Sequence, residues 1–425
     1  MRPSAQLQQR FTQAVETRLA ALNAPPTPSV AQLRAHGEAR FRALELPGRG
    51  NEFWKYSPAS ALMDPDLLVA AGSIGAPVQI PRLPGVTPTR LLIVEGRLVN
   101  VENVQPGVTV TPNEGPVEER DGDPRPFVAL NAALSEGHVL IHIAAGSRLS
   151  APIELVLAQG ESRVARSAMP RVRVVVGAGA EVTLIERQVG THRVWTNAVL
   201  ELAIEPEANV AHHRVGLETG QGLWLTALDV DVQELAHYRL LQALAGSALR
   251  RNEVDVRLHG SGSDFEMASA TFTQGGDHLD NQVAVQHLAS DCRSHQTHRS
   301  IAANESRTVL NGRIYIARDA QRTDAQLSTK NLLLHKSAEV DAKPELEIYA
   351  DNVKCAHGAT VGSIDPEALF YLRSRGFSMR RARSVLSFAF LAGVVDAFGI
   401  QPLGDEVRAT LEQAFSHVET DPEPS

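Results

Sequence analysis

The sequence is poor in the residues that most directly indicate a chemistry. It has two cysteines in 425 residues, too few for a disulfide framework, and the simplest setting for such a chain is a reducing compartment. No glycine precedes any of its five lysines, which are Lys55, Lys330, Lys336, Lys343 and Lys354. A phosphate-binding loop of the form GxxxxGKS or GxxxxGKT is therefore absent, which excludes the commonest kind of ATPase.

Three further features bear on whether the protein binds nucleic acid, spans a membrane or is exported. The formal charge of −8 argues against nucleic acid, because phosphate binding needs a basic face. The longest apolar stretch, residues 385–395, is too short for a membrane span of about 20 residues. The first 22 residues carry scattered charges and no continuous apolar segment, so we expect no signal peptide there. These features predict a cytoplasmic protein that binds neither nucleic acid nor membrane.

What the sequence does contain begins with two helices. Apolar residues fall at helical spacing along the first segment, at Phe11, Val15, Leu19 and Leu22. Ser29 and Gln32 have the spacing of a capping box and predict a second helix that runs towards Leu46. From about residue 58 to residue 88 the chain is rich in proline, glycine and alanine, which is typical of a connector.

Short apolar runs with a period of two then occupy about 250 residues, from Leu91 to Ile348, and we expect no helix among them. A recurring unit has apolar, small and apolar residues at fixed spacing, as in Val176, Ala180 and Val182. Its copies start at intervals of 24 to 30 residues, at Val176, Ile204, Val232, Leu258, Leu288, Ile316 and Val340. This even repeat predicts a β-solenoid, in which each turn covers the one before it. The alternative is accidental periodicity in a β-sandwich.

Helices are expected again after the strands. Asp365 is followed by proline, the order of an N-cap and a first helical residue, and Gly376 is placed to end that helix. Ser378 opens a longer helix with apolar residues three to four positions apart, and Asp405 is expected to begin a last one. The tail from His417 onwards is acidic and contains proline, so we expect it to be disordered.

Histidines and cysteines are the candidate metal ligands. His287, Cys292, His295 and His298 form the densest group. Alternate residues of a strand face opposite sides, so these four cannot meet at one metal from a single strand. Cys292 also stands at the small-residue position of the repeat, where we expect a buried core thiol.

Cys355 and His357 form a second candidate site. Because they are two residues apart, on a strand their side chains would point the same way, with Cα atoms about 6–7 Å apart. This spacing suits two ligands of one metal or cluster, or a thiolate activated by an imidazole. The alternative is a buried thiol beside a surface histidine.

Two further groups are candidates for function. Asp229 and Asp231 are the residue type that lines sugar-cleaving grooves, although such pairs are more often a solvated strand face. The basic and apolar segment from Phe370 to Arg383 predicts a docking surface for a partner protein, with Phe370 and Tyr371 as anchors. The alternative for this segment is a solvated helix face.

The later part of the chain closely resembles a known family. The resemblance rests on KPELEIYADNVKCAHGATVG and EALFYLRSRG, with support from SHQTHRS, VLNGRIYIARDAQRTDAQ, NLLL and GRGNEFWKYSP. It runs from about Leu46 to Val395 and is densest after Cys292. On these motifs the chain is similar to the SufB/SufD family of the SUF iron–sulfur cluster assembly machinery, and to its SufD branch rather than SufB.

The resemblance implies a mainly β protein with a right-handed parallel β-helix core and helical N- and C-terminal regions. It also implies a non-catalytic scaffold subunit that pairs with SufB through the β-helix, binds the ATPase SufC and helps to build and transfer nascent Fe–S clusters. By the same resemblance His357, with Cys355 beside it, lies at the SufB interface and helps to hold iron or the nascent cluster. The SufC-docking residues would be Phe370, Tyr371, Leu372, Arg373 and Arg375.

We therefore expect a helical region and connector over residues 1–90, a β-helix over 91–362, a SufC-docking helical region over 363–416 and a disordered tail over 417–425. An Fe–S cluster usually takes four protein ligands, so one thiolate and one imidazole predict that a partner supplies the others. The residues leave open whether this chain alone binds iron, a cluster or a flavin. Two other interpretations also stay open, a β-helix enzyme acting on polysaccharides and a solenoid that self-associates, for example as a homodimer.

Overall fold

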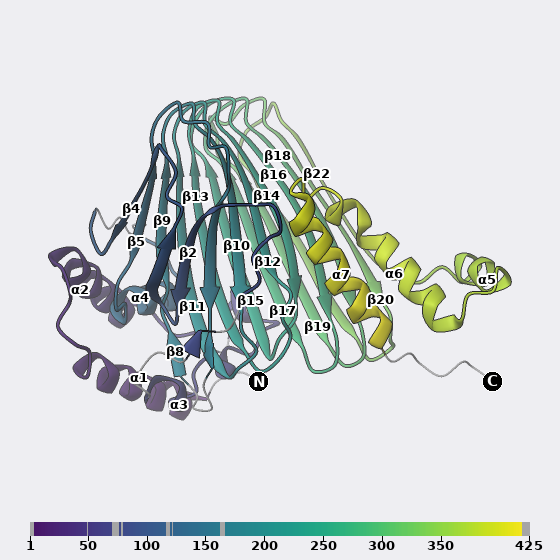
Figure 1. Cartoon of the computed structure of the whole chain (residues 1–425), viewed down its shortest axis with the longest axis horizontal. Coiled ribbons are helices and arrows are strands. Elements are labelled where there is room, and N and C mark those ends of the chain that lie inside the picture. Colours follow the sequence, from purple (N-terminus) through teal and green to yellow (C-terminus); the bar gives the residue numbers. More distant parts are fainter. Residues whose placement is uncertain are drawn as a thin grey trace.

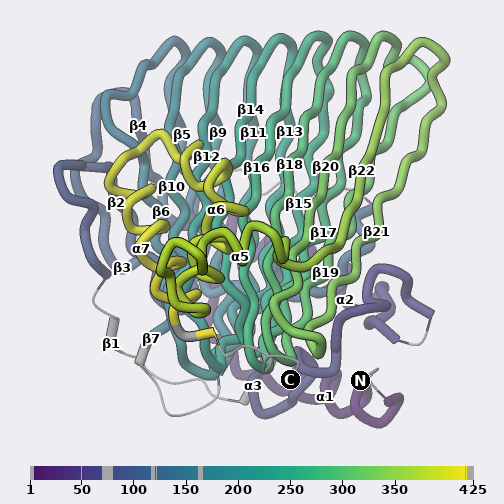
Figure 2. Tube along the Cα trace, turned by 90° about the vertical axis from the view of Figure 1, so that its right-hand side faces the viewer, coloured from purple at the N-terminus to yellow at the C-terminus, as the bar shows by residue number. Residues whose placement is uncertain are grey.

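The computed structural model describes residues 4–48, 50–69, 76–77, 80–115, 120, 122–161 and 166–418. Two large sheets face each other in a flattened β-solenoid, with helices on both outer faces (Figure 1). Seen from the side, the turns of the solenoid stand next to one another in chain order (Figure 2). Residues 419–425 of the expected tail lie outside the described residues.

Sheet I has the strand order β22-β20-β18-β16-β14-β12-β10-β6-β2-β3. Its strands are β2 (Thr89–Val94), β3 (Arg97–Glu102), β6 (Ile153–Ala158), β10 (Glu181–Val189), β12 (Asn209–Gly216), β14 (His237–Ala245), β16 (Asp264–Thr273), β18 (Arg293–Ala302), β20 (Asp324–Leu333) and β22 (Lys354–Ser363). The strands pair in parallel except β3, which returns antiparallel on β2.

Sheet II has the order β21-β19-β17-β15-β13-β11-β9-β5-β4, with β8 also paired to β11. Its strands are β4 (Val108–Pro112), β5 (Val139–Ile143), β8 (Arg166–Ala168), β9 (Arg171–Val176), β11 (Val194–Ile204), β13 (Leu223–Val232), β15 (Leu249–Leu258), β17 (His278–His287), β19 (Arg307–Ile316) and β21 (Glu339–Ile348). Here β4 is the antiparallel strand, paired to β5. A separate ribbon joins β1 (Ala76–Pro77) to β7 (Gly160–Glu161).

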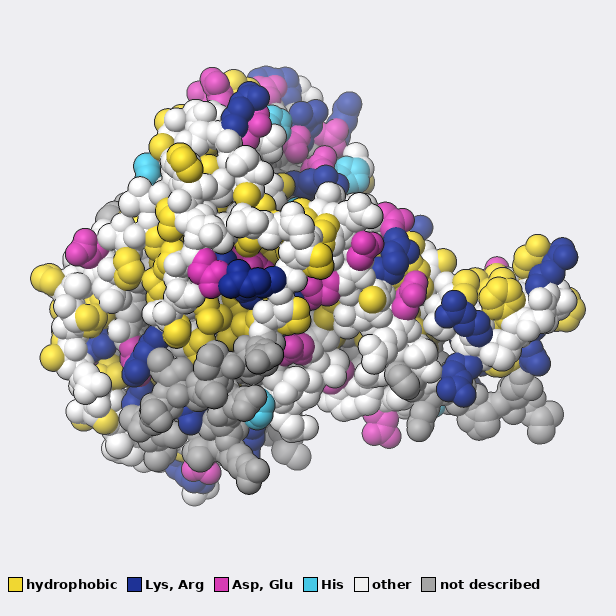
Figure 3. Space-filling view, viewed as in Figure 1, with side chains coloured by type: hydrophobic (Ala, Val, Ile, Leu, Met, Phe, Trp, Pro, Cys, Tyr) yellow, Lys and Arg dark blue, Asp and Glu magenta, His cyan; other side chains and the backbone are white. Residues whose placement is uncertain are grey.

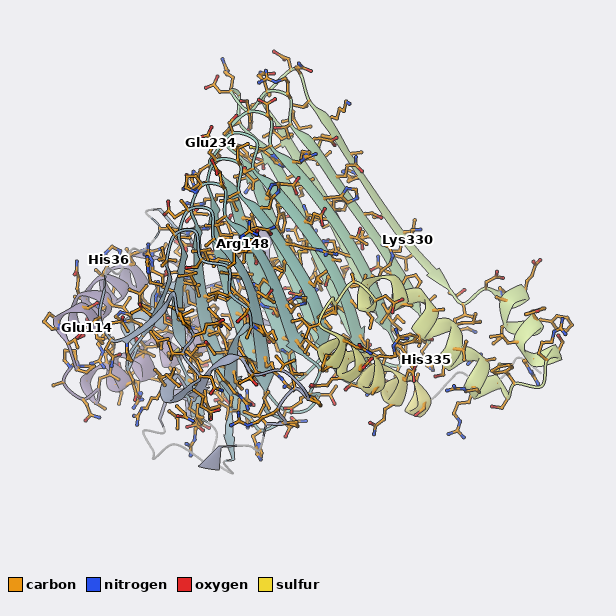
Figure 4. The ribbon with its side chains drawn as sticks, turned by 45° about the horizontal axis from the view of Figure 1, so that its top comes forward. His36, Glu114, Arg148, Glu234, Lys330 and His335 are labelled. Carbon is orange, nitrogen blue, oxygen red and sulfur yellow. The ribbon has the colours of Figure 1, made fainter. Side chains whose placement is uncertain are left out.

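The repeated unit of the sequence corresponds to the corner at which the chain passes from sheet II to sheet I. At five successive corners the small residues Ala180, Ala208, Ala236, Ser263 and Cys292 are fully buried. At six corners the residue that directly precedes this small buried residue has a positive φ. These six residues are Gly179, Glu207, Leu235, Gly262, Asp291 and Arg322. This left-handed residue turns the chain inward, so the next side chain points into the core and must be small. Figure 4 labels Glu234 at one of these corners.

The prediction of the solenoid is confirmed, but two copies of the repeat were misplaced. The strand register continues the column of Leu258 with His287, where the sequence suggested Leu288. It continues the column of Ile316 with Ile348, whereas the predicted Val340 lies at the beginning of β21. The alternation of apolar and polar residues looks the same all along a strand. It therefore does not show at which residue the strand ends.

The N-terminal region contains α1 (Ala5–Ala20), α2 (Pro28–Ala43), η1 (Glu52–Trp54), η2 (Ala59–Ala61) and α3 (Asp66–Val69). The predicted capping box of the second helix was wrong. Thr27 is the N-cap and accepts from the Val30 amide, while Pro28 is the first helical residue. Proline suits this position because its missing N–H has no partner there in any helix. Ser29 instead donates its hydroxyl to the Gly115 carbonyl.

A helix also interrupts the strands, contrary to prediction. Helix α4 (Pro126–Ala133) lies between β4 and β5, and all eight of its residues are buried. A helix that is apolar on every side shows no helical period, so periodicity could not reveal it. Helix α2 crosses α4 closely at Gly37, where an added Cβ would lie 2.5 Å from the Ala132 Cβ.

Three helices follow the solenoid: α5 (Pro366–Ser374), α6 (Met379–Val395) and α7 (Gln401–His417). The caps Asp365 and Ser378 are confirmed, since each accepts a backbone N–H of its helix. Gly376, with φ of +90°, follows the end of α5 as predicted. The last helix begins at Gln401 rather than Asp405, with a proline in its first turn.

The core has three main parts. Side chains of both sheets fill the inside of the solenoid, as Leu184, Leu202 and Val230 do. The N-terminal helices and α4 pack on the outer face of sheet II around aromatic residues such as Trp195. Helices α6 and α7 pack on the outer face of sheet I, where Phe415 lies edge-on against Phe272. The two helical regions therefore cover opposite sheets.

Candidate functional site

Cys355 and His357 lie in β22, the last strand of sheet I. In the strand register Cys355 pairs with Ala325 and His357 with Leu327, and both of these neighbours are buried in the core. Side chains in one column of a solenoid share a direction, so Cys355 and His357 point towards the inside of the last turn. His357 is nevertheless exposed and Cys355 is half-buried. No further turn of the described chain covers them.

The surroundings of Cys355 favour its neutral form. The thiol packs at the margin of a small apolar cluster that includes Ile314 and Ala325. Burial raises the pKa of Cys355, and the carboxylate of Asp324 on the neighbouring strand adds to this effect. The isolated chain therefore does not provide the activated thiolate considered as one use of the pair, because activation needs a lowered pKa. A bound cation would stabilise the thiolate directly.

The denser histidine group does not form a site. His287 is fully buried at the end of β17, with its Nε2 2.9 Å from the Ser294 hydroxyl, whereas His295 is exposed on β18. His298 points into the core, and burial lowers its pKa to about 4. Cys292 is a buried corner residue whose Sγ lies 3.3 Å from the Ser263 hydroxyl, as expected for a core thiol. No cluster of three or more potential metal ligands occurs among the described residues.

The acidic pair Asp229 and Asp231 does not form a pair of free carboxylates. Asp229 is nearly buried and accepts from Arg125 at 2.8 Å and from Arg120 at 3.3 Å. Asp231 also pairs with Arg120, at 3.3 Å, and with His259 at 2.9 Å. Glycoside cleavage needs one carboxyl group to act as acid and another as base or nucleophile, and these carboxylates are instead occupied by cations.

The predicted docking residues lie on α5, which projects from the rest of the molecule (Figure 1). No residue of this helix is buried, and Phe370 and Tyr371 are 74% and 56% exposed. Leu372 is half-buried, and Arg373 and Arg375 are exposed, with the Arg375 guanidinium 5.1 Å from the centre of the Tyr371 ring. Figure 3 shows hydrophobic and basic side chains together on this projecting part.

Sequence reasoning missed the extent of the exposed inner face at the end of the solenoid. The apolar runs of the sequence stopped at Ile348, and the expected β-helix continued to residue 362. Strand β22 lies in that last stretch and places Val361 in the inner column, 50% exposed. The alternation of CAHGATVG was a usable signal, because a residue of the inner column recurs at every second position. Asp324 was also missed, since its electrostatic effect on Cys355 depends on the pairing of β20 with β22.

Comparison with known proteins identifies the family. The SufBD core domain of SUF-system FeS cluster assembly matches residues 156–390. The chain is 32% identical over 380 residues to the iron–sulfur cluster assembly protein SufD of Escherichia coli, covering 87% of this chain and 89% of the relative. It is 27% identical to a SufBD family protein of Synechocystis, over 86% of this chain and 87% of the relative.

A SufBD family protein of Mycobacterium leprae is 23% identical over 89% of this chain and 93% of its own length. Among the described helices none is both long and apolar enough to cross a membrane. The matched core begins within β6, continues through the later strands of the solenoid to β22, and ends within α6. The chain thus belongs to the SufBD family of SUF-system iron–sulfur cluster assembly proteins.

Proposed function

We propose that this chain is a non-catalytic scaffold subunit of a SUF Fe–S assembly complex in the cytoplasm. In this proposal it pairs with SufB through the β-helix, over residues 91–362, and binds the ATPase SufC through the helical region over residues 363–416. The complex would build nascent clusters and pass them to acceptor proteins. Family membership supports the role in Fe–S cluster assembly, and the specific partners are part of the proposal.

The position of Cys355 and His357 carries the proposal. They offer one thiol and one imidazole on the inner column of an uncovered last turn, and a bound cation would convert the thiol to a thiolate ligand. A cluster or iron ion held there needs further ligands, because iron–sulfur sites usually have four. A partner that stacks on β21 and β22 would enclose the two side chains and could supply those ligands. We therefore propose a shared site at the SufB interface, with His357 and Cys355 as the contribution of this chain.

Helix α5 supports the proposal for SufC. It presents Phe370 and Tyr371 to solvent beside exposed arginines, and aromatic residues with arginine are enriched where binding energy is concentrated. Helix α5 packs against α6, and none of its residues is buried. Because the sequence has no phosphate-binding loop, the proposal assigns ATP hydrolysis to this partner.

Anaerobic co-expression with the cognate SufB and SufC tests the proposal. We expect a stable complex that contains iron and sulfide, and we expect His357→Ala to assemble normally but to lose most of the bound iron. His295→Ala is the matched control, since His295 is an exposed histidine on β18 of the same sheet. A chain that forms no complex would contradict the scaffold proposal. A His357→Ala complex with its full iron content would show that His357 is not a ligand of the iron.

A second pair of variants tests the docking helix separately. Phe370→Asp should release SufC and leave SufB bound, because it places a charge on an apolar anchor. Leu235→Asp is the control, since Leu235 is also exposed, at 52%, but lies at a corner of the solenoid. If SufC binds the Phe370→Asp complex unchanged, α5 is not its docking site. Mass measurement of the chain alone also shows whether the open end pairs with a second copy.

A further inference from the structure

A cavity lies away from the proposed cluster site, on the outer face of sheet II. It has a volume of about 400 Å³, within the range of small-molecule sites. Its floor is formed by β15, β17 and β19, and its walls by η1 and by the segment that leads into α4. In the strand register Ala284 stands between Asp255 and Arg313. This short side chain among long ones explains why the sheet is hollowed there.

One half of the cavity is aromatic. The ring of Trp54 lies over the Arg251 guanidinium, 3.9 Å from it, and meets Phe127 edge-on with 5.5 Å between ring centres. These contacts hold Trp54 in place before any ligand arrives, which lowers the entropy that binding costs. Phe53, at the mouth, is 52% exposed. Trp54 is only 8% exposed, so a flat ligand would stack on the ring of Phe53 and meet the exposed part of Trp54.

The other half is lined by amides. Gln282 donates its amide N–H to Asp280 at 2.6 Å, and Gln286 donates to Asp255 at 2.8 Å. Both side-chain carbonyls therefore remain as acceptors at the floor. Asn311 has a buried Oδ1 without a hydrogen-bond partner among the described residues. Such a set of amide groups matches the donor and acceptor edges of a heterocycle.

The arginines of the cavity differ in how many hydrogen bonds they already make to carboxylates of the chain. Arg125 bonds Asp123 and Asp229, both within 3 Å, and Arg251 bonds Glu253 and Asp280. These two guanidiniums are occupied by carboxylates of the chain itself. They shape the wall but have little capacity left for a ligand.

Arg257 and Arg313 make fewer hydrogen bonds to carboxylates. Arg257 approaches Asp255 only to 3.8 Å, and that carboxylate is already paired with Arg120 at 3.0 Å. Arg313 donates one N–H to Glu347 at 2.7 Å, and its side chain is 35% exposed. In both, Nε has no hydrogen-bond partner among the residues that the structure describes. An anionic group at this side of the cavity would meet two guanidiniums with spare donors.

We propose that this cavity binds a flat heteroaromatic molecule that carries one anionic group and is about the size of a nucleoside monophosphate. Its ring stacks on Phe53 beside Trp54 and meets the amides of Gln282 and Asn311. Its anionic group binds Arg257 and Arg313. The site lies on the sheet opposite to the one that carries β22 and α6, so it does not depend on the proposed scaffold function.

Calorimetric titration of the purified full chain tests this with three probes: AMP, adenosine and inorganic phosphate. We expect AMP to bind one site, and adenosine and phosphate each to bind about tenfold or more weakly, because each lacks half of the contacts. Absence of saturable AMP binding up to about 1 mM would overturn the proposal. Equal binding of adenosine and AMP would overturn the role of the two arginines.

Matched variants locate the site. Ala284→Leu fills the floor and should abolish AMP binding, whereas Ala203→Leu, an outward alanine of β11 outside the cavity, should not. Arg257→Gln should weaken AMP about tenfold and leave adenosine unchanged, with Arg239→Gln on sheet I as its control. Unchanged AMP binding by Ala284→Leu would place the site elsewhere. Because Arg257 is partly exposed, its variant keeps the test valid if Ala284→Leu folds poorly.

Discussion

The two ends of the solenoid are built differently. At the first end β3 and β4 turn back antiparallel on β2 and β5, so the inner residues Leu91 and Ile141 are fully buried. At the other end β21 and β22 each have a neighbour on one side only within the described chain, and Val361 is 50% exposed. A solenoid needs a cap because its terminal turn leaves apolar surface and strand edges unpaired. Within the described residues the chain caps one end itself and leaves the other open.

The largest difference in unfolding free energy is expected between substitutions of two residues in the same inner column. Leu244 lies in the middle of the solenoid and is fully buried, and the strand register continues its column to Val361. We expect Leu244→Ala to lower the free energy of unfolding by about 2–5 kcal/mol. Val361→Ala should change it by less than about 0.5 kcal/mol in the isolated chain. Urea unfolding measures both, and equal losses would mean that the last turn is already covered.

The next effect concerns the helices that hold the closed end. Gly37→Ala would place a Cβ 2.5 Å from the Ala132 Cβ, where α2 crosses α4, so we expect a loss of about 1–3 kcal/mol. Gly393→Ala in α6 is the control, because a Cβ there meets nothing within 4 Å. It should stabilise the protein by about 0.5–1 kcal/mol, the helix preference of alanine over glycine. Thermal unfolding that ranks the two variants the other way would contradict the close crossing.

A third prediction concerns pH and the buried interior. Burial, with a smaller effect of Arg299, lowers the pKa of His298 to about 4, whereas an unfolded chain protonates histidine near 6.5. The unfolded state therefore binds more protons between these values, and stability falls as the pH drops through this window. We expect His298 to account for about 1–2 kcal/mol of the loss between about pH 7 and pH 5.

Replacement of that histidine removes its share of the pH dependence. His298→Gln should lose less stability than the wild type on going to low pH, measured by urea unfolding at several pH values. His295→Gln is the control, since His295 lies on the same strand but is exposed. A pH dependence that is unaltered in His298→Gln would show that this imidazole reaches solvent.

The smallest effect lies at the open end. Desolvation and then Asp324 raise the pKa of Cys355, so Asp324→Asn should lower that pKa and increase the thiolate fraction at mildly alkaline pH. We expect alkylation of Cys355 to become about twofold faster. Asp264→Asn on β16, two strands away in the same sheet, is the control. A slower reaction in Asp324→Asn would contradict this electrostatic assignment.

The solenoid was predictable from sequence because its corners demand a particular residue. A left-handed residue such as Leu235 must be followed by a small inward residue such as Ala236, and this constraint recurs at six corners of the solenoid. The same logic placed Cys292 in the core. Helix α4 was not predictable, because its residues are buried on every side and show no helical period.

The candidate site was predictable only in part. The spacing of Cys355 and His357 indicated that they share a face, but not that this face is the uncovered inner column of the last turn. The position of this face depends on strand pairing between distant segments, as does the electrostatic effect of Asp324 on Cys355. The cavity at Ala284 depends on three strands and two N-terminal segments meeting in space, for which no local pattern exists.

We propose that a partner covers the open end of the solenoid. Alkylation of Cys355 tests this most directly. The rate is measured by mass spectrometry for the chain alone and for the chain co-purified with SufB, with the buried Cys292 as an internal control. We predict that Cys355 reacts in the isolated chain and is protected about tenfold or more in the complex. An unchanged rate in a complex whose mass shows SufB bound would contradict the account.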